Sequence, residues 1–219
     1  MGENKAMGTI NPAGPVMNIR LAPALLALAG LLAAGCAHRR SRDALDSQEH
    51  VRLGSTYEAQ GLRAEAVAQY EAAVRRDPDC VEGWVALGNV AFTEGRLEAA
   101  ESSFRTALKA APHHPGACNN LAMTILSRGG NLKEAEALAR DALGQPGPLR
   151  PYILDTLANI QLRQRLYAEA LDLVAQAEAG TPTDGALVRA QLKATRDSIQ
   201  AAAGIREHAP GQTPHPAKP

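Results

Sequence analysis

Apolar and small residues return at fixed positions every 34 residues through the middle of the chain. The matched positions are Leu53 and Leu87, Gly54 and Gly88, Gly61 and Gly95, Ala66 and Ala100, Tyr70 and Phe104, Ala73 and Ala107, and Pro78 and Pro112. So many matches at one spacing indicate an internal repeat in which each copy is one supersecondary unit. The pattern predicts two helices in each copy, joined by a turn at the glycine and ended by the proline.

The repeat divides this region into four copies, at residues 47–80, 81–114, 115–150 and 151–184. The third copy is two residues longer than the others. One residue is added at the turn formed by 127–130, and another enters near 144–148. The fourth copy resumes the pattern with Leu157, Ala158, Tyr167, Ala170, Ala177 and Pro182.

The turn within each copy needs a residue that tolerates left-handed dihedral angles, and glycine does so at little cost. Gly61, Gly95 and Gly130 occupy this place in the first three copies, whereas the fourth copy has Arg165. A side chain strains the backbone in this conformation. We therefore expect the fourth turn to be strained or slightly altered.

A single apolar stripe follows the last copy. It consists of Val188, Leu192, Thr195, Ile199 and Ala202, at steps of four and three residues. This spacing predicts one helix over residues 185–203, with Asp184 or Thr183 available as its N-cap. Such a helix would cover the exposed face of the last copy, as stacked repeats require. Residues 204–219 contain four prolines and few apolar side chains, so we expect a disordered tail.

The repeat resembles the tetratricopeptide repeat (TPR) family. The resemblance is best seen in the second copy, in Trp84, Leu87, Gly88, Ala100, Phe104, Ala107 and Pro112. It covers residues 47–184 and implies an all-α fold, a right-handed solenoid of about four helix-turn-helix repeats with a C-terminal capping helix. We expect Tyr70, Phe104 and Trp84 to fill the space between neighbouring repeats.

The first 35 residues have the composition of a signal peptide. Arg20 supplies a positive charge, and residues 21–34 follow without a charged or polar side chain. Residues 1–16 are too polar to belong to such a segment, which makes Met17 an alternative start of translation. A membrane helix that stays uncut is the rival interpretation, because the apolar stretch is near the lower length limit for crossing a bilayer.

The run Leu32-Ala33-Ala34-Gly35-Cys36 resembles the lipobox of bacterial lipoproteins, although that pattern prefers leucine at the place of Ala33. The resemblance implies cleavage before Cys36, a diacylglyceryl group on its sulfur, and a fatty acid such as palmitate on its new amine. Residues 36–46 would then be a lipidated, polar tether. Because Ala37 follows the cysteine, the resemblance favours the outer membrane of an organism that has one, with the protein facing the periplasm.

Stacked TPR units present a concave surface lined by the first helix of each pair. Family positions that contact ligands map onto several residues of that surface. We select Asn89, Phe92, Asn119, Met123, Tyr152, Asp155 and Asn159 as the candidate peptide-binding groove. Amide side chains both donate and accept, so they can hold the backbone of an extended peptide. An equally open alternative is that the asparagines only join neighbouring helices by hydrogen bonds. The carboxylate clamp of chaperone-tail receptors is missing, because Val51 stands at its lysine position.

Charge and motifs narrow the possible functions. Removing residues 1–35 takes away two basic side chains and one acidic side chain, which leaves 21 basic and 22 acidic ones. This balance argues against nucleic acid as a ligand. The sequence has no nucleophile elbow, no helical pair of metal-binding histidines and no phosphate-binding glycine loop. We therefore expect no catalysis, no cofactor, no metal and no small-molecule substrate.

The adjacent histidines and two of the cysteines are best explained without a functional site. His113 and His114 lie between two prolines, and adjacent residues point apart, so a solvated loop is favoured over a metal site. Cys80 and Cys118 occupy different places in their repeats, so we prefer two buried thiols to a disulfide.

Together these features predict a membrane-anchored scaffold that binds a protein or peptide of the cell envelope and could assist assembly of an envelope complex. One alternative is a pilotin-like lipoprotein that helps a secretin assemble during type IV pilus biogenesis. Another is a repeat domain that supports an unrecognised cell-envelope enzyme.

Overall fold

The computed structural model describes residues 45–145, 147–182 and 184–204. The signal peptide predicted for residues 1–35, Cys36 with most of its tether, and nearly all of the tail predicted for 204–219 lie outside the described residues. The same holds for Thr183, one of the two candidate N-caps.

Within the described ranges the chain forms nine α-helices and no strand. They are α2 (Ser47–Ala59), α3 (Arg63–Arg76), α4 (Val81–Thr93), α5 (Leu97–Ala110), α6 (Pro115–Ser127), α7 (Leu132–Leu143), α8 (Arg150–Arg163), α9 (Tyr167–Ala179) and α10 (Ala186–Ala203). The all-α class predicted from the sequence is confirmed. The first helix of the last pair begins at Arg150, one residue before the predicted start of that copy.

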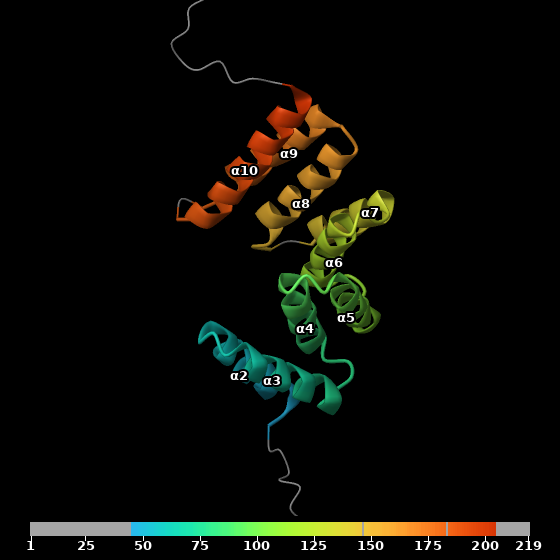
Figure 1. Cartoon of the computed structure of the whole chain (residues 1–219), viewed down its shortest axis with the longest axis vertical. Coiled ribbons are helices and arrows are strands. Elements are labelled where there is room, and N and C mark those ends of the chain that lie inside the picture. The colour runs from blue at the N-terminus through green and yellow to red at the C-terminus, as the bar shows by residue number, and fades with distance from the viewer. Residues whose placement is uncertain (1–44, 146, 183, 205–219) are drawn as a thin grey trace, which may run out of the picture. The chain divides into compact units, whose positions relative to one another are not determined.

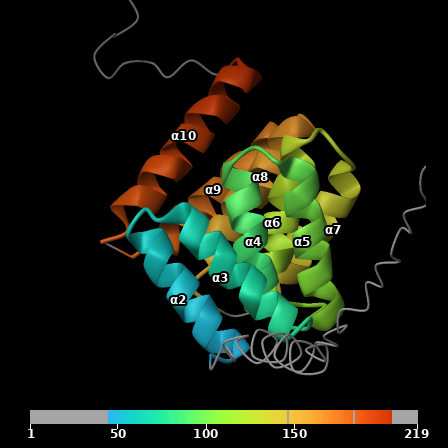
Figure 2. The ribbon, with the colours of Figure 1, turned by 60° about the horizontal axis from the view of Figure 1, so that its bottom comes forward.

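The helices pack as consecutive pairs, α2 with α3, α4 with α5, α6 with α7, and α8 with α9 (Figure 1). Each second helix also packs on the first helix of the next pair. The first helices α2, α4, α6 and α8 contact one another in turn, so they line one side of the stack (Figure 2). The last helix, α10, packs on both α9 and α8. This places α10 beside the face that the first helices form.

Small residues make the close approaches within each pair possible. Ala66, Ala100, Ala135 and Ala170, one from each second helix, are fully buried.

Tyr70 and Phe104 are also buried, as predicted. Trp84 differs from the prediction, because it is only half-buried. Its indole N–H donates to the carbonyl of Pro78 at 2.8 Å, so it closes the loop between the first two pairs.

Three of the four turns have glycine in the left-handed region, at Gly61, Gly95 and Gly129. The third differs from the prediction, which placed Gly130 there. The amide of Gly130 instead donates to the carbonyl of Ile125, as the amide of Arg96 does to Ala91 in the second turn. The added residue of the third copy therefore lies after the left-handed position and not before it.

The fourth turn keeps the left-handed geometry without a glycine. Arg165 has a φ of 64° and is the one non-glycine residue with a positive φ in the described ranges. The expected strain of this turn is thus present in the backbone. The capping helix also departs from expectation, since Gly185 occupies its N-cap and no side chain of the described residues, including that of Asp184, caps it.

Candidate functional site

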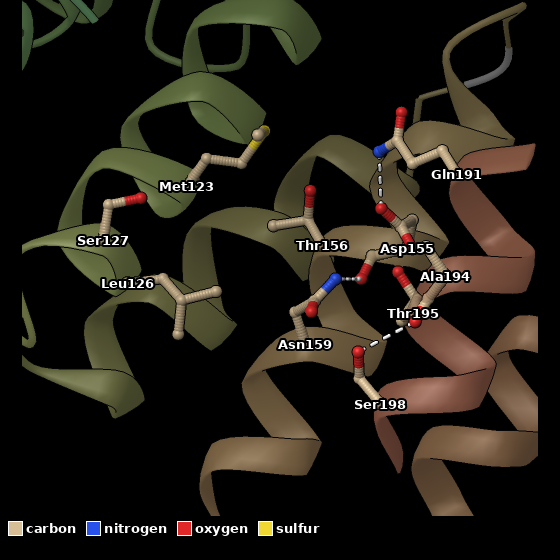
Figure 3. A pocket seen from close by; sticks show the side chains of 10 residues that line it. All are labelled: Met123, Leu126, Ser127, Asp155, Thr156, Asn159, Gln191, Ala194, Thr195 and Ser198. Atoms are coloured by element: carbon tan, nitrogen blue, oxygen red, sulfur yellow. Dashed lines mark hydrogen bonds between the residues drawn. The ribbon is translucent and has the colours of Figure 1, made fainter. Parts of the chain in front are cut away.

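Two adjoining cavities lie on the face formed by the first helices and α10. The larger has a volume of about 370 Å³ and is lined by Met123, Leu126 and Ser127 of α6, Asp155, Thr156 and Asn159 of α8, and Gln191, Ala194, Thr195 and Ser198 of α10. Figure 3 shows the α6 side chains across the cavity from those of α8 and α10. The smaller has a volume of about 160 Å³ and is lined by Asn89, Phe92, Thr93, Phe104, Asn120 and Met123. Met123 lines both cavities, so they are neighbours.

The residues selected from the sequence divide between these cavities. Met123, Asp155 and Asn159 line the larger one, and Asn89 and Phe92 line the smaller one together with Met123. The structure therefore brings these selected positions to one continuous face.

Two selected residues lie elsewhere. The side chain of Tyr152 is exposed and lines neither cavity. Asn119 is buried, and its amide group donates to Asn120 and approaches the sulfur of Met123. Its neighbour Asn120, which the sequence did not single out, lines the smaller cavity instead.

The asparagines also serve the packing between helices. The amide of Asn120 donates to the side-chain oxygen of Asn89 at 2.7 Å and so joins α6 to α4. The amide of Asn159 donates to the carbonyl of Asp155 within α8 at 2.9 Å. Asn89 therefore takes part in a hydrogen bond between neighbouring helices, which was the alternative left open by the sequence. Its side chain also lines the smaller cavity.

Asp155 is the unusual polar group of the larger cavity. The residue is only 6% exposed, in the middle of α8. One carboxylate oxygen, Oδ2, accepts a hydrogen bond of 2.6 Å from the amide of Gln191 on α10 (Figure 3). The other, Oδ1, is buried and has no hydrogen-bond partner among the described residues. A buried carboxylate with an unfilled acceptor is costly unless a donor reaches it.

The contribution of α10 to the cavity was missed in the sequence, where this helix was interpreted only as a cap. Gln191, Ala194, Thr195 and Ser198 form one wall of the larger cavity. The repeat pattern could not reveal them, because they follow the last copy and have no counterpart in the repeats. Their spacing of three and four residues was the available signal, since it places them on one face of a helix.

The histidine and cysteine residues form a separate polar group at the loop between α5 and α6. The ring of His113 lies 3.0 Å from both carboxylate oxygens of Asp141 on α7. The single S–H of Cys118 has two acceptors within reach, a carboxylate oxygen of Asp141 at 3.5 Å and the carbonyl oxygen of Pro112 at 3.7 Å from the sulfur. The loop is thus exposed, as predicted, but its first histidine has a partner that lies 28 residues further along the chain.

Both described cysteines are buried and free, which agrees with the preferred interpretation of two buried thiols. Burial raises the pKa of the Cys118 thiol to about 12, and the neighbouring Asp141 carboxylate adds to this effect. Burial also raises the pKa of Cys80. Because the thiolate is the nucleophilic form, neither thiol is suited to nucleophilic catalysis near neutral pH.

In the part of the chain that the structure describes, no three His, Cys, Asp or Glu side chains converge in a way that could hold a metal ion. The described helices also include none with the length and apolar character needed to cross a membrane. The rival interpretation of an uncut membrane helix concerns residues 1–35, which lie outside the described ranges.

Comparison with known proteins identifies the repeat. A family profile described as tetratricopeptide repeat matches residues 51–115 and 117–185. Among curated proteins, mouse "Tetratricopeptide repeat protein 14" is 34% identical over 98 residues. That match covers 45% of this chain but only 13% of the mouse protein, so it extends over a small part of that relative.

Solved structures with the same fold include YrrB, PilF and PilW. YrrB, "a TPR protein with an unusual peptide-binding site", is 16% identical, with a TM-score of 0.56 over 80% of this chain and 84% of that chain. PilF of Pseudomonas aeruginosa is 16% identical, with a TM-score of 0.56 over 83% and 86% of the two chains. PilW, a "widely conserved type IV pilus biogenesis factor", is 20% identical, with a TM-score of 0.58 over 74% and 79%. At these identities the similarity shows the fold alone.

Proposed function

The chain belongs to the tetratricopeptide repeat family, and from this premise we propose that it is a lipid-anchored scaffold of a bacterial cell envelope. In this proposal it binds an extended segment of a partner protein along α4, α6, α8 and α10. The observation that carries the proposal is the pair of adjoining cavities on that face. Concave faces that hold a few placed polar groups among apolar side chains are typical of binding sites.

The chemistry of the face suits a peptide. Phe92, Leu126 and Met123 offer apolar contact area, while Asn89 and Asn159 carry amides at the cavity walls. Flexible thioether and aromatic side chains adapt to a partner surface. Amides can pair with the backbone of a bound segment whatever its sequence. A partner with an extended segment could therefore be held by its backbone and selected by its side chains.

Membrane attachment is supported by the sequence around Cys36. Small residues precede this cysteine, a signal-like apolar stretch leads to it, and a polar segment separates it from α2. Each buried methylene of a lipid contributes about 0.8 kcal/mol, and a single chain anchors only marginally. Two or three acyl chains on Cys36 would make attachment durable and hold the scaffold at the membrane surface.

Intact mass of the protein extracted from the membranes of its native host tests this anchor. The expected mass is that of a chain beginning at Cys36 with two or three acyl groups, and a Cys36→Ala variant should lack this species. An unmodified full-length mass would contradict the anchor and leave a membrane helix or an unanchored protein as the alternatives.

A pilotin-like role is the second candidate, and the shared fold with PilF and PilW is the observation that favours it. In that case deletion of the gene should reduce assembled secretin and surface pili, and a Cys36→Ala copy should fail to restore them. Normal pili in the deletion strain would exclude this role while leaving the general scaffold proposal in place.

A further inference from the structure

The larger cavity contains a single ionisable group, the carboxylate of Asp155. None of the residues that line it is Lys, Arg or His. Asp155 is also the one buried acidic residue in the described ranges, and its Oδ1 atom lacks a hydrogen-bond partner there. A buried negative charge of this kind favours a positively charged partner group.

Three other polar side chains of the cavity already have partners within their own helices. The hydroxyl of Thr156 donates to the carbonyl of Tyr152, and that of Ser198 donates to Ala194. The amide of Asn159 donates to the carbonyl of Asp155. Among the residues that line the cavity, the buried side-chain atom without a hydrogen-bond partner is Oδ1 of Asp155. This acceptor on a carboxylate calls for a donor, preferably a charged one.

The side-chain amide of Gln191 occupies the position in which a donor would approach the Asp155 carboxylate. This residue is on the exposed side of α10, yet its amide reaches into the cavity and donates to Oδ2 of Asp155 at 2.6 Å. A neutral amide supplies a weaker hydrogen bond to a carboxylate than an ammonium or guanidinium group does. A cationic group could therefore displace this amide, or bind beside it on Oδ1.

The neighbouring cavity has a different character. Phe92, Phe104 and Met123 line it, and its volume of about 160 Å³ suits one apolar side chain rather than a whole ligand. Because Met123 lines both cavities, they adjoin, and one extended segment can place side chains in both. A bound segment would thus be recognised by two side chains of opposite character.

We propose that the groove recognises a partner segment with an apolar side chain in the cavity between α4 and α6 and a Lys or Arg side chain in the cavity between α6, α8 and α10. Asp155 is the residue that pairs with the cation, and Gln191 holds its place when no ligand is bound. This inference rests on the proposed function and specifies the chemistry of its partner.

Fluorescence anisotropy of the full-length protein with labelled peptides tests the inference. The probes are N-labelled Leu-Arg amides in which zero to three glycines separate the two residues, each with a twin that has the neutral isostere citrulline in place of arginine. We expect one spacing to bind best, and its citrulline twin to bind about tenfold more weakly or worse, because it lacks the charge that pairs with Asp155.

Three variants assign the effect to the cavity. Asp155→Asn keeps the shape and can still accept from Gln191, so it should remove the preference for arginine while the thermal melt stays cooperative. Gln191→Ala should tighten arginine binding about threefold or more, since the competing amide is gone. Asp172→Asn is the matched control, because Asp172 also accepts from a glutamine amide, at 2.7 Å from Gln176, but lies on the exposed side of α9.

Equal binding of the arginine and citrulline peptides would overturn the inference and leave a groove that binds segments without reading charge. A preference for arginine that survives Asp155→Asn would also overturn it, because another group would then recognise the cation. Absence of binding by every peptide would also overturn it. The proposed function is tested separately, by crosslinking from the groove to a partner in cells, so the two can fail independently.

Discussion

Gly88 and Phe104 touch at the tightest point of the second helix pair. A Cβ atom added to Gly88 would lie 2.5 Å from Cε1 of the Phe104 ring, and the ring is fully buried. Gly54 and Tyr70 have the same relationship one repeat earlier, again at 2.5 Å. The two glycine–ring pairs are 34 residues apart in the chain. A glycine is needed opposite each ring because a side chain there would overlap it, and this explains why both positions repeat in the sequence.

A Gly88→Ala substitution should therefore destabilise the protein. Alanine gains about 1 kcal/mol over glycine in a helix, but overpacking a filled core costs about 1–3 kcal/mol. Because the added Cβ would overlap the buried Phe104 ring, we expect a net loss of up to about 2 kcal/mol in urea unfolding. Gly180→Ala is the control, since its Cβ would lie 3.5 Å from the nearest atom, and it should change stability by less than about 0.5 kcal/mol.

At the strained turn of Arg165, in contrast, a substitution should increase the free energy of unfolding. A non-glycine residue in the left-handed region costs about 1–2 kcal/mol, while glycine costs about 0.5–1 kcal/mol in unfolded-state entropy. Arg165→Gly should thus raise the unfolding free energy by up to about 1 kcal/mol. The reciprocal Gly95→Arg change, at a turn where a Cβ would meet nothing within 4 Å, should lower it by a similar amount. A destabilised Arg165→Gly protein would show that the arginine side chain contributes more than its backbone strain costs.

The buried thiols should resist alkylation in the folded protein. With a pKa of about 12, Cys118 is almost wholly protonated at pH 8, and it is fully buried. Iodoacetamide should leave Cys80 and Cys118 unmodified under native conditions and modify both in guanidinium chloride, as mass spectrometry of the Cys36→Ala variant would show. Burial is the largest cause of the Cys118 shift, so Asp141→Asn should not make this thiol reactive. Rapid native modification would contradict the buried placement.

A network of charges joins the second and third helix pairs on the second-helix side of the stack. Glu101 of α5 accepts from Arg105 at 2.9 Å and also pairs with Arg128 in the turn after α6. Arg105 reaches across to Glu134 of α7 at 2.9 Å. The hydrogen bond from Arg105 is the largest cause that lowers the pKa of Glu101 below its ordinary value of 4.5.

This network predicts a pH-dependent contribution to stability. Because the folded-state pKa of Glu101 is lowered, its contribution is present above about pH 4.5 and is lost as the pH falls through the lowered value. Glu101→Gln should cost about 0.5–1 kcal/mol at pH 7, and the difference from the natural protein should shrink in acid. Glu71→Gln removes an isolated exposed pair with Arg75 and should cost less than about 0.5 kcal/mol. An equal loss in both variants would mean that the network has no special role.

The repeat architecture could be predicted from the sequence because its determinants are local and recur. Gly54 and Gly88 mark close helix approaches, Ala66 and Ala100 mark the facing positions, and Gly61 marks a left-handed turn. The third turn was misplaced by one residue because two consecutive glycines, at 129 and 130, both fit the local requirement. The positive φ of Gly129 and the hydrogen bond from Gly130 to Ile125 decide between them.

The candidate site was only partly predictable, because its chemistry depends on contacts between distant segments. Gln191 meets Asp155 across 36 residues of chain, and no repeat pattern relates the two. Asn119 and Asn120 differ by one step on α6, which turns the side chain by about 100° around the helix, so the family position alone did not show which one lines the cavity. The pair of His113 and Asp141 was missed for the same reason.

The central claim is that the face formed by the first helices and α10 binds a partner. Photocrosslinking in the native host tests it most directly, with p-benzoylphenylalanine placed at Leu126, which lines the larger cavity, and at Ser102, which is exposed on α5. We predict that one partner crosslinks from Leu126 and not from Ser102, and that it is captured less when Asp155→Asn is added. A partner that crosslinks from Ser102 but not from Leu126 would contradict the account and place binding on the opposite side of the helix pairs.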